Sequence, residues 1–408
     1  MTEPQMRVAF VSVSAALGGS EWVLLDLVSG AGRAGITPLV LAPKEGPLTE
    51  ELTRRAVPWA VAPAPDSLLS LSQRPGAGGV AAGASLVSGL WSWSRAIARE
   101  VGRAFPARAG DPVILYSNGF KAHLACSAVR APRHVWHLHE FPPERVGLVW
   151  RALAGALPSA TIANSRSVAD AWRLGGLPPA TFVHNGVDLE RFAPTPRTGW
   201  IHEQLGLDSD ARLIGMPAVF ARWKGHLAVV DAFQSGPAQA TDDVHLVLVG
   251  GPIYDTAAER GYAEELVRRV SRGSLSGAAG PRPMHERVHF LKFQREPWKL
   301  YPEFDVVVHF STRPEPFGRV ILEAMASGVP VIAARAGGPT EIVEDGTSGW
   351  LVTPGDVRGL AAAMTTALDA DRAAVGGAGR RAAEQRFSVG SYVDGVAAVI
   401  RRAYEAGR

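Results

Sequence analysis

The sequence predicts an α/β protein of two consecutive domains, each with a parallel sheet covered by helices. Three observations support this fold class. The chain has 408 residues, more than one hydrophobic core usually supports. Short runs rich in β-branched residues alternate with longer stretches of helical periodicity. This alternation stops near the middle, at the turn signal Asn185-Gly186 and the prolines Pro194 and Pro196, and then restarts.

The first half opens with an apolar run at residues 8–13, which predicts a buried strand. The segment Gly18-Gly19-Ser20-Glu21 follows it, and residues 22–31 have apolar side chains at helical spacing. Further strands are predicted at 38–41, 113–116, 134–139 and 161–163. Residues 66–90 are rich in Gly, Ala and Ser, so we expect a long loop there and assign it no secondary structure.

The second half repeats the pattern. Strands are predicted at 213–219, 245–249, 288–291, 306–310, 329–333 and 350–352, with helices at 257–272, 317–327 and 357–368. A last helix, 391–404, follows the second sheet. We therefore expect two doubly wound, Rossmann-like domains at 1–195 and 196–388, and a C-terminal helix at 389–408. Ligands of such folds bind beyond the carboxyl ends of the strands, so the loops there are the candidate sites.

Composition excludes several classes of protein. The apolar fraction is 47% and the charged fraction 20%, which is unlike a disordered chain. Cys126 is the single cysteine, so an intramolecular disulfide and a multi-cysteine metal site are excluded. The N-terminus lacks the pattern of a signal peptide, and no apolar run has the length of a membrane-spanning helix. We expect a cytoplasmic protein.

Residues 1–195 carry 18 Lys and Arg against 14 Asp and Glu, so the first half is basic. Part of this charge follows two tryptophans; the residues are Trp91, Trp93, Arg95, Arg99, Arg103 and Arg108. Two interpretations stay open: an amphipathic segment that lies on the anionic inner face of the cell membrane, or a solvated helix face with its tryptophans in the core. No aromatic and basic pattern is long enough to predict nucleic-acid binding.

The most informative segment is 312–351. Glu315 precedes a predicted helix, and Glu323 lies about two turns inside it. A helix N-terminus suits an anion such as a diphosphate, and Gly318 lets the backbone approach that anion closely. Glu323 can then accept both hydroxyls of a ribose, and Glu315 hydroxyls of a sugar. Taken singly, a solvated helix glutamate and a capping loop glutamate explain the two residues as well.

The two glutamates lie within Pro-Glu-Pro-Phe-Gly and Glu-Ala-Met-Ala-Ser-Gly-Val-Pro-Val, which resemble the signature of glycosyltransferase family 4, a retaining family with the GT-B fold. Gly337-Gly338 and the residues up to 352 are similar to that family's next segment. The strand at 8–13 with Gly18-Gly19, the pair Asn164-Ser165 and the segment 185–188 agree with it in order and spacing. The resemblance covers nearly the whole chain and is strongest at 181–352.

This resemblance implies two Rossmann-like domains facing a central cleft, with the acceptor in the first and a nucleotide sugar in the second. The residues that it implies for donor binding are Gly18, Gly19, Arg222, Lys224, Glu315, Phe317, Gly318, Arg319 and Glu323. It implies catalytic roles for His139, Glu315 and Lys224.

Arg222-Trp223-Lys224-Gly225 resembles the family's basic loop. Breaking a sugar–phosphate bond adds negative charge to the diphosphate, which Lys224 and Arg222 can stabilise. Many members have an arginine about five residues before this lysine, where this chain has Val219, so Arg222 is the candidate substitute. Arg319 is a further candidate for phosphate, with an exposed helix position as the alternative.

The segment His134-Val-Trp-His137-Leu-His139-Glu140 raises the possibility of a zinc site. Its histidines alternate in direction on a strand, so His137 and His139 share one face. The resemblance instead implies that His139 lies near the donor sugar, where it orients a hydroxyl or helps the acceptor lose a proton. We expect His137 to be structural, His226 to begin a helix, and Asp208-Ser-Asp210 to be a turn.

We therefore expect a retaining glycosyltransferase that uses a nucleotide-diphosphate sugar and needs neither metal nor cofactor. Its acceptor is a glycan, a lipid-linked molecule or a small molecule. Three alternatives stay open: a nucleotide-sugar epimerase of the same architecture, a sugar-phosphate synthase, and a non-catalytic nucleotide-sugar-binding protein. The sequence leaves the sugar, the base and the acceptor open.

Overall fold

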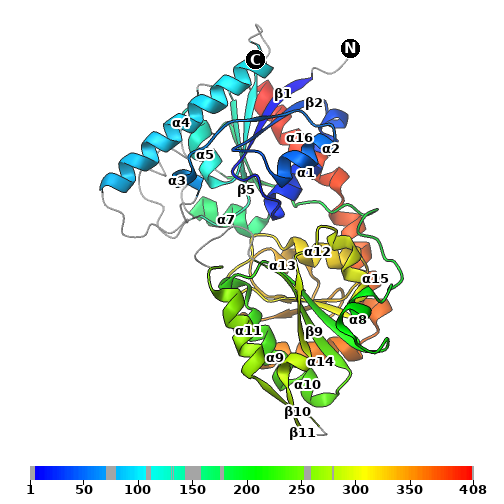
Figure 1. Cartoon of the computed structure of the whole chain (residues 1–408). Coiled ribbons are helices and arrows are strands. Elements are labelled where there is room, and N and C mark those ends of the chain that lie inside the picture. Colours follow the sequence, from blue (N-terminus) through cyan, green and yellow to red (C-terminus); the bar gives the residue numbers. More distant parts are fainter. Residues whose placement is uncertain are drawn as a thin grey trace. The chain divides into compact units, whose positions relative to one another are not determined.

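A computed structural model describes residues 5–69, 80–106, 112–129, 131, 133–142, 158–174, 179–251, 259–277 and 280–406 (Figure 1). The chain divides into two compact units. The first consists of Met1–Gly186 and Val389–Arg408, and the second of Val187–Ser388. Each unit has a parallel sheet with helices on both faces, so the predicted fold class is confirmed.

The boundary between the units lies nine residues before the predicted one at 195. Residues after 186 are held by the second unit through backbone contacts. Val187 N donates to the carbonyl of Phe387 (2.8 Å), and Arg380 donates to the carbonyls of Leu189 (3.1 Å) and Phe192 (2.8 Å). The prolines Pro194 and Pro196 predicted a linker there, but these hydrogen bonds determine that residues 187–195 belong to the second unit.

In the described part of the first unit the sheet has seven strands in the order β3-β2-β1-β4-β5-β6-β7, all parallel. The strands are β1 (Met6–Ser12), β2 (Ile36–Ala42), β3 (Trp59–Val61), β4 (Ile114–Asn118), β5 (Arg133–Leu138), β6 (Ala160–Ala163) and β7 (Thr181–Phe182). The order reverses between β1 and β4, which makes that edge of the sheet the expected ligand-binding position.

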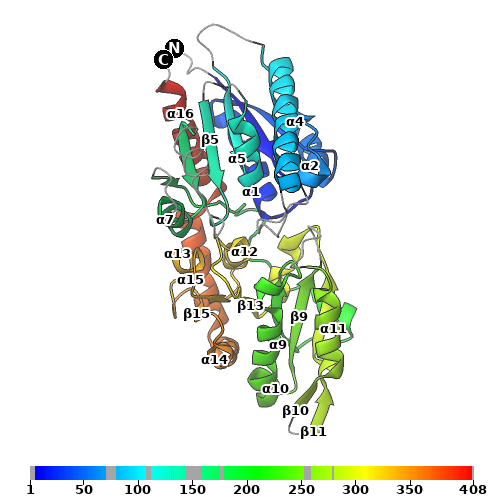
Figure 2. The ribbon, with the colours of Figure 1, turned by 90° about the vertical axis from the view of Figure 1, so that its left-hand side faces the viewer.

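Helices cover both faces of the first sheet (Figures 1 and 2). They are α1 (Gly19–Gly30), the 3-10 turn η1 (Ala31–Ala34), α2 (Pro47–Arg54), α3 (Asp66–Leu69), α4 (Val80–Ala104), α5 (Phe120–Ser127), α7 (Arg166–Leu174) and α16 (Val389–Glu405). The apolar side chains of α1, α2 and α16 form one core, and those of α3, α4 and α5 form the core of the opposite face. The C-terminal helix thus completes the core of the first unit, although the whole second unit separates the two segments in sequence.

The expected loop at 66–90 is wrong for its described residues. Residues 66–69 form α3, and α4 begins at Val80. Small residues obscured the helical period at the start of α4, but Trp93, Ala96 and Ile97 anchor the helix in the core. The Trp93 ring N–H donates to the carbonyl of Ala62 (3.1 Å). Residues 70–79 and Arg108 lie outside the described residues.

Six parallel strands form the sheet in the described part of the second unit, in the order β12-β9-β8-β13-β14-β15. They are β8 (Arg212–Pro217), β9 (Val244–Gly250), β12 (Val288–Lys292), β13 (Val306–His309), β14 (Val331–Ala334) and β15 (Trp350–Val352). An antiparallel hairpin of β10 (Ser274–Gly277) and β11 (Gly280–Pro283) was not predicted. The order reverses between β8 and β13, so a second candidate position lies beyond these two strands.

The helices of the second unit also divide between the two faces of its sheet. They are α8 (Trp200–Leu205), α9 (His226–Ser235), α10 (Pro237–Ala240), α11 (Tyr262–Arg272), α12 (Arg319–Ala326), α13 (Pro339–Ile342), α14 (Val357–Asp369) and α15 (Arg372–Arg386). The described residues of this unit also form four 3-10 turns: η2 (Arg222–Lys224), η3 (Met284–Glu286), η4 (Pro297–Lys299) and η5 (Tyr301–Glu303). The helix predicted from 257 begins at Tyr262, and residues 252–258 lie outside the described part.

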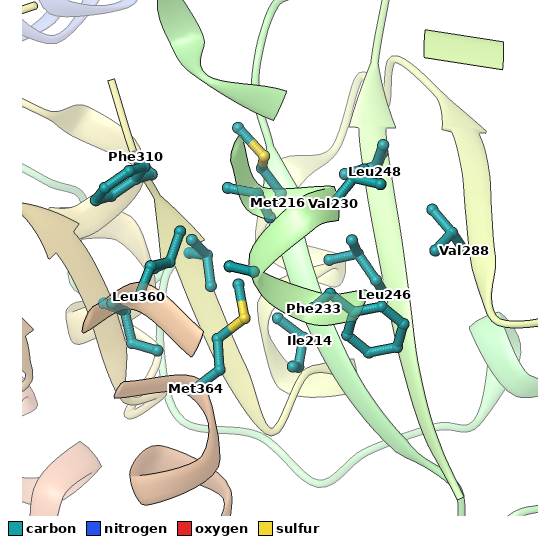
Figure 3. Packing of buried hydrophobic residues seen from close by; sticks show 14 of the residues in the cluster. Ile214, Met216, Val230, Phe233, Leu246, Leu248, Val288, Phe310, Leu360 and Met364 are labelled. Carbon is teal, nitrogen blue, oxygen red and sulfur yellow. The ribbon is translucent and has the colours of Figure 1, made fainter. Parts of the chain in front are cut away.

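Successive side chains of a strand point to opposite faces of the sheet, so each strand contributes side chains to two cores. Leu246 and Leu248 of β9 point into the core under α9, α11 and α14, while Val247 and Val249 point into the core under α12 and α15. Figure 3 shows the first of these cores, where Phe233 of α9 lies beside the side chains of β9. Strands buried on both faces appear as continuous apolar runs, which is why the sequence predicted them.

Candidate functional site

The first candidate site lies where the strand order of the second sheet reverses. β8 and β13 are neighbours, and the loops that follow their carboxyl ends contact each other. Thr312 N donates to the carbonyl of Trp223 (2.8 Å), which holds the loop after β13 against the basic loop after β8. Residues 224 and 315, which are 91 positions apart in sequence, are brought together here.

Lys224 and Glu315 form a buried ion pair. The Lys224 ammonium lies 2.9 Å from Oε2 and 3.1 Å from Oε1 of Glu315, and only 12% and 11% of the two side chains are exposed. Ser311 donates its hydroxyl to Oε2 of the same carboxylate (2.8 Å). His309 Nε2 lies 3.4 Å from the ammonium and 3.5 Å from Glu315 Oε2. The ammonium also lies 4.0 Å from the ring centroid of Trp223, within cation–π range.

Charge dominates the protonation of this cluster. Burial acts to raise the pKa of Glu315, but the ammonium of Lys224, the imidazole of His309, which is cationic in the acid range where Glu315 titrates, and the hydrogen bonds from Lys224 and Ser311 lower it to about 2. Burial lowers the pKa of His309 to about 4. At neutral pH the cluster therefore contains a carboxylate that only accepts hydrogen bonds and a neutral imidazole.

Two glycines allow the loops to approach so closely. Gly225 has φ +79°, and a Cβ there would lie 2.1 Å from the carbonyl oxygen of Phe310. Gly337 has φ +76°, and a Cβ there would lie 2.2 Å from the carbonyl oxygen of Glu315. Gly338 N donates to that same carbonyl (2.8 Å), which joins the loop after β14 to the loop after β13. The loop after β14 thereby fixes the backbone of Glu315 in the loop after β13.

Glu323 lies in α12, as predicted, but about one turn inside it rather than two, because the helix begins at Arg319. Arg319 Nε donates to its Oε1 (3.1 Å), Nη2 of the same guanidinium lies 3.0 Å from that oxygen, and the Tyr301 hydroxyl donates to Oε2 (2.6 Å). Gly318 precedes the helix with φ +109° and acts as its N-cap. Since the first N–H groups of a helix have no acceptor within it, the start of α12 offers donors to an anion.

Two predicted donor-binding residues are placed apart from this cluster. Arg222 forms an ion pair with Glu265 of α11, and its guanidinium lies 5.1 Å from the ring centroid of Tyr262. The Phe317 side chain is buried in the core with its ring against Phe387. Phe317 therefore offers a ligand its backbone rather than its ring.

In the first unit, polar residues gather where the order of its strands reverses. Asn118 ends β4, and its Oδ1 lies 2.5 Å from Nε2 of His139, directly after β5. Asn118 also donates its amide to the carbonyl of Ser20 (3.4 Å), at the start of α1. Gly18 is the N-cap of this helix, Gly19 is its first residue, and Gly18 N donates to the buried carboxyl group of Glu21 (3.1 Å).

The contact with Asn118 defines the state of His139. An amide oxygen only accepts, so Nε2 of His139 carries the proton and Nδ1 has the lone pair. Burial lowers the pKa of His139 to about 3, so the ring is neutral and weakly basic. His137 is fully buried, as expected for a structural residue, with Nδ1 2.5 Å from the Tyr116 hydroxyl. The described residues contain no group of three or more His, Cys, Asp and Glu side chains suited to a metal ion.

Burial and hydrogen bonds place the other residues for which the sequence offered interpretations. His226 is the first residue of α9, as predicted, and is fully buried. Asp208 belongs to a turn, since its carbonyl accepts from Ala211 N (3.1 Å). The tryptophans of α4 divide between the two interpretations: Trp93 lies in the core and Trp91 is 56% exposed. Across the described parts of the chain, no helix is both long and apolar enough to cross a bilayer.

Four residues that support the site are not among the predicted site residues. His309 lies inside a predicted strand and Ser311 directly follows it, and both lie within six residues of Glu315. Their position directly after a buried strand was the available signal. Tyr301 and Asn118 carry no local signal, because their partners are 22 and 21 residues away.

Family models match most of the chain. The model described as "Glycosyltransferase Family 4" matches residues 17–191, and the model described as "Glycosyl transferases group 1" matches residues 200–382. Among curated proteins, the D-inositol 3-phosphate glycosyltransferase of Mycolicibacterium vanbaalenii is 33% identical over 193 residues, which are 47% of this chain and 41% of that protein. That of Mycobacterium marinum is 32% identical over 234 residues, 55% of this chain and 46% of that protein. The matched segments thus span under half the length of these relatives.

Solved structures match over nearly the full length. The Anabaena protein Alr3699/HepE in complex with UDP-glucose is 26% identical with a TM-score of 0.78, covering 97% of this chain and 100% of that one. Sucrose-phosphate synthase from Thermosynechococcus elongatus is 20% identical with a TM-score of 0.70, over 98% and 100%, and shares the fold. The chain therefore belongs to glycosyltransferase family 4, the group 1 glycosyltransferases, and has their GT-B fold.

Proposed function

We propose that this protein transfers a sugar from a nucleotide-diphosphate sugar to an acceptor hydroxyl with retention of anomeric configuration. The observation that carries the proposal is the buried Lys224–Glu315 ion pair, which lies beyond the carboxyl ends of β8 and β13. Gly225 and Gly337 leave room beside it for the backbone carbonyls of Phe310 and Glu315. Such an ion pair combines a cation for the leaving group with a permanent acceptor for sugar hydroxyls. A purely structural ion pair would not need to lie where the strand order reverses.

In this proposal the second unit binds the donor. The start of α12 and Lys224 contact the diphosphate, and Gly318 and Phe317 contribute backbone there. Glu323 accepts the ribose hydroxyls, in an orientation set by Arg319 and Tyr301. Arg319 is occupied by Glu323, so we assign phosphate binding to Lys224 first. Arg222 reaches phosphate only if it leaves Glu265.

The chemistry is a substitution at the anomeric carbon. The bond between this carbon and the β-phosphate oxygen breaks, and its electron pair leaves on the diphosphate, where the positive charge of Lys224 stabilises it. The acceptor oxygen attacks from the same face, and its proton passes to the departing phosphate oxygen. Glu315 holds the sugar by its hydroxyls and forms no bond to it. Two carboxylates placed as in retaining glycosidases are then not required.

The first unit is assigned to the acceptor, with His139 as its contact. A neutral ring with a pKa of about 3 is a poor base at neutral pH, but it can orient a hydroxyl through Nδ1. This argues for orientation by His139 and for proton transfer to the phosphate. Gly18 and Gly19 begin α1 beside the Asn118–Ser20 contact, where a close backbone approach to ligand is possible.

The donor that we test first is a UDP-sugar, because the similar Anabaena protein was solved with UDP-glucose. We propose that neither a metal ion nor another cofactor is needed, since Lys224 and the start of α12 supply the charge for the diphosphate. The acceptor class is a glycan, a lipid-linked molecule or a small hydroxylated molecule, and the setting is cytoplasmic glycoconjugate synthesis.

The deciding experiment measures nucleotide release from UDP-, GDP- and ADP-sugars with EDTA present. Wild type is compared with Lys224→Ala, Glu323→Ala and the matched control Lys299→Ala, an exposed lysine of the same unit that pairs with Glu296. We expect release from one donor, lowered about 100-fold or more by Lys224→Ala and unchanged by the control.

Other outcomes separate the alternatives. Conversion of the donor into a new nucleotide sugar identifies an epimerase, and binding without turnover identifies a binding protein. Release that stops in EDTA contradicts metal independence. Inverted configuration in the product, or a glycosyl-enzyme trapped in Glu315→Gln, contradicts same-face attack.

We also propose that α4 contacts an anionic membrane surface at the inner face of the cell membrane. Val87 (64%) and Trp91 (56%) are exposed, and they continue along the helix into Arg95, Arg99 and Arg103. Arg95 stacks on Trp91, 4.2 Å from its ring centroid. An exposed tryptophan followed by arginines suits the interface between acyl chains and anionic headgroups.

Sedimentation with vesicles tests this contact. Wild type is expected to bind vesicles that contain 30% anionic lipid and not neutral vesicles, and a Trp91→Ala/Arg95→Ala variant is expected to lose most binding. The control is Arg173→Ala, on the exposed surface of α7. Equal binding by wild type and the double variant contradicts the assignment.

A further inference from the structure

His309 takes part in none of the roles assigned above, although it is one of the groups closest to Lys224. It is the last residue of β13, is 3% exposed, and contacts the ion pair through Nε2. The titratable groups that face it are Lys224, Glu315 and, from α9, His226. A buried histidine between a lysine and a glutamate needs an explanation beyond packing.

The donors of Lys224 define the state of this imidazole. An ammonium has three N–H donors and no acceptor. Two of these contacts are with the two oxygens of Glu315, and the third is with Nε2 of His309 at 3.4 Å. Nε2 accepts from the ammonium when it presents its lone pair, which places the ring proton on Nδ1; its contact with Oε2 of Glu315, at 3.5 Å, is the longer of the two. The lowered pKa of His309, about 4, agrees with a neutral ring at working pH.

The neutral state of His309 matters because Lys224 is proposed to stabilise the negative charge of the leaving diphosphate. With both oxygens of Glu315 on the ammonium, no N–H is left for a phosphate unless Glu315 gives up one contact. Sugar hydroxyls that bind to Glu315 would free such an N–H. A second carboxylate beside Lys224 would instead cancel the charge that the leaving diphosphate requires.

We propose that His309 is a positioning residue for Lys224: its unprotonated Nε2 holds the ammonium in place, without neutralising it, while Glu315 exchanges the lysine for the donor sugar. This inference rests on the proposed function and deepens it. It adds a neutral acceptor to the site and predicts that residue 309 affects the chemical step more than donor affinity, because Lys224 itself remains present.

Two substitutions of similar length test the idea. Gln and Met both have unbranched side chains, but only His309→Gln retains an oxygen, as far from the backbone as Nε2, that can accept from Lys224. We expect His309→Met to lower kcat about 10- to 100-fold with less than a threefold change in donor KM, and His309→Gln to recover most of kcat. His309→Glu is expected to be as impaired as His309→Met. The control is His289→Met, a histidine of β12 that pairs with His245 (3.0 Å).

Equal loss of kcat in the Gln and Met variants, in proportion to a lowered Tm, would show a structural role and overturn the proposal. Full activity of His309→Met would overturn it as well. If wild type releases nucleotide from no donor, the proposed function fails instead.

A measurement on the wild type keeps the two failures distinct. Long-range 1H–15N correlation spectra of protein labelled at histidine report the tautomer of each ring. The signal of His309 is assigned by its loss in either variant or, if neither folds, by its shift in Lys224→Gln. An Nδ1–H tautomer with unprotonated Nε2 is expected, and an Nε2–H tautomer would overturn the contact with Lys224 regardless of activity.

Discussion

At Gly337 two constraints coincide: φ is +76°, and the position of a Cβ is occupied by the carbonyl of Glu315, 2.2 Å away. Gly346 has nearly the same φ, +78°, but nothing lies within 4 Å of its Cβ position. A comparison of alanine variants at these two glycines therefore separates the energy of a strained left-handed backbone from the energy needed to displace the carbonyl of Glu315.

Gly346→Ala is expected to lower the free energy of unfolding by about 1–2 kcal/mol through backbone strain alone. Gly337→Ala is expected to cost more, about 3 kcal/mol or above, and to reduce nucleotide release, because the carbonyl of Glu315 must move. Urea unfolding and nucleotide release are measured on both variants. Equal effects of the two substitutions on nucleotide release would contradict the role of Gly337 in holding Glu315.

Glu315 makes a second prediction at this scale, from acid. Its pKa in the folded protein, about 2, lies below the ordinary 4.5, so its stabilisation is complete above about pH 4.5 and is lost as pH falls toward 2. The difference in unfolding free energy between wild type and Glu315→Gln should therefore be about 1 kcal/mol smaller at pH 4 than at pH 7. Urea titrations at the two pH values measure it. A difference in unfolding free energy that grows in acid would mean that these partners do not lower the pKa of Glu315.

At the scale of elements, α12 links the core to the candidate donor site. Its buried side chains, including Ile321, Leu322 and Met325, pack into one core of the second sheet. Its polar face presents Glu323 to Arg319 and to Tyr301 of η5. The helix was predicted from its apolar spacing, but the partner in η5 was not, because nothing in the sequence near Tyr301 indicates it.

Tyr301→Phe removes one buried hydrogen bond from Glu323. We expect a loss of about 1–2 kcal/mol in unfolding free energy and a rise in donor KM of several-fold, since the orientation of Glu323 is set from one side only. The matched control is Tyr116→Phe in the first unit, whose hydroxyl contacts His137 at 2.5 Å. That variant should lose comparable stability with an unchanged donor KM, and a raised KM in both would assign the effect to stability alone.

The first residues of α4 could not be predicted as helical from the spacing of apolar residues. Its first residues are small and were assigned no structure, because the apolar period is weak until Trp93 and Ile97. Those side chains are buried only because the sheet and α5 lie against them. Tertiary packing, rather than local propensity, makes this segment helical.

At the scale of the whole molecule, buried histidines make stability depend on pH. Burial lowers their pKa values from 6.5 to about 3 or 4; the residues are His123, His139, His226, His245, His289 and His309. Their contribution is complete above pH 6.5 and is lost as pH falls, because the unfolded chain binds protons that the folded chain does not. Burial raises the pKa of Glu21 to about 7 and also raises the pKa of Glu140; both act in the opposite sense, but they are two groups against these six histidines.

Tm is therefore expected to fall between pH 7.5 and pH 5, by on the order of 10 °C. Differential scanning calorimetry across this range measures it, and His226→Leu, which removes one buried ring from α9, should reduce the slope. A Tm that stays constant or rises toward pH 5 would show that these rings are protonated in the folded protein.

Local sequence patterns predict the two α/β domains, most strands and the two glutamates of the second domain. These are local properties: buried parallel strands appear as apolar runs, and motif residues lie within one turn and helix. Three other features arise from long-range packing: residues 187–195 join the second unit, Arg222 pairs with Glu265, and His309 contacts Lys224. Each of these depends on partners many residues away, which a sheet brings together at its carboxyl edge and a linear pattern does not specify.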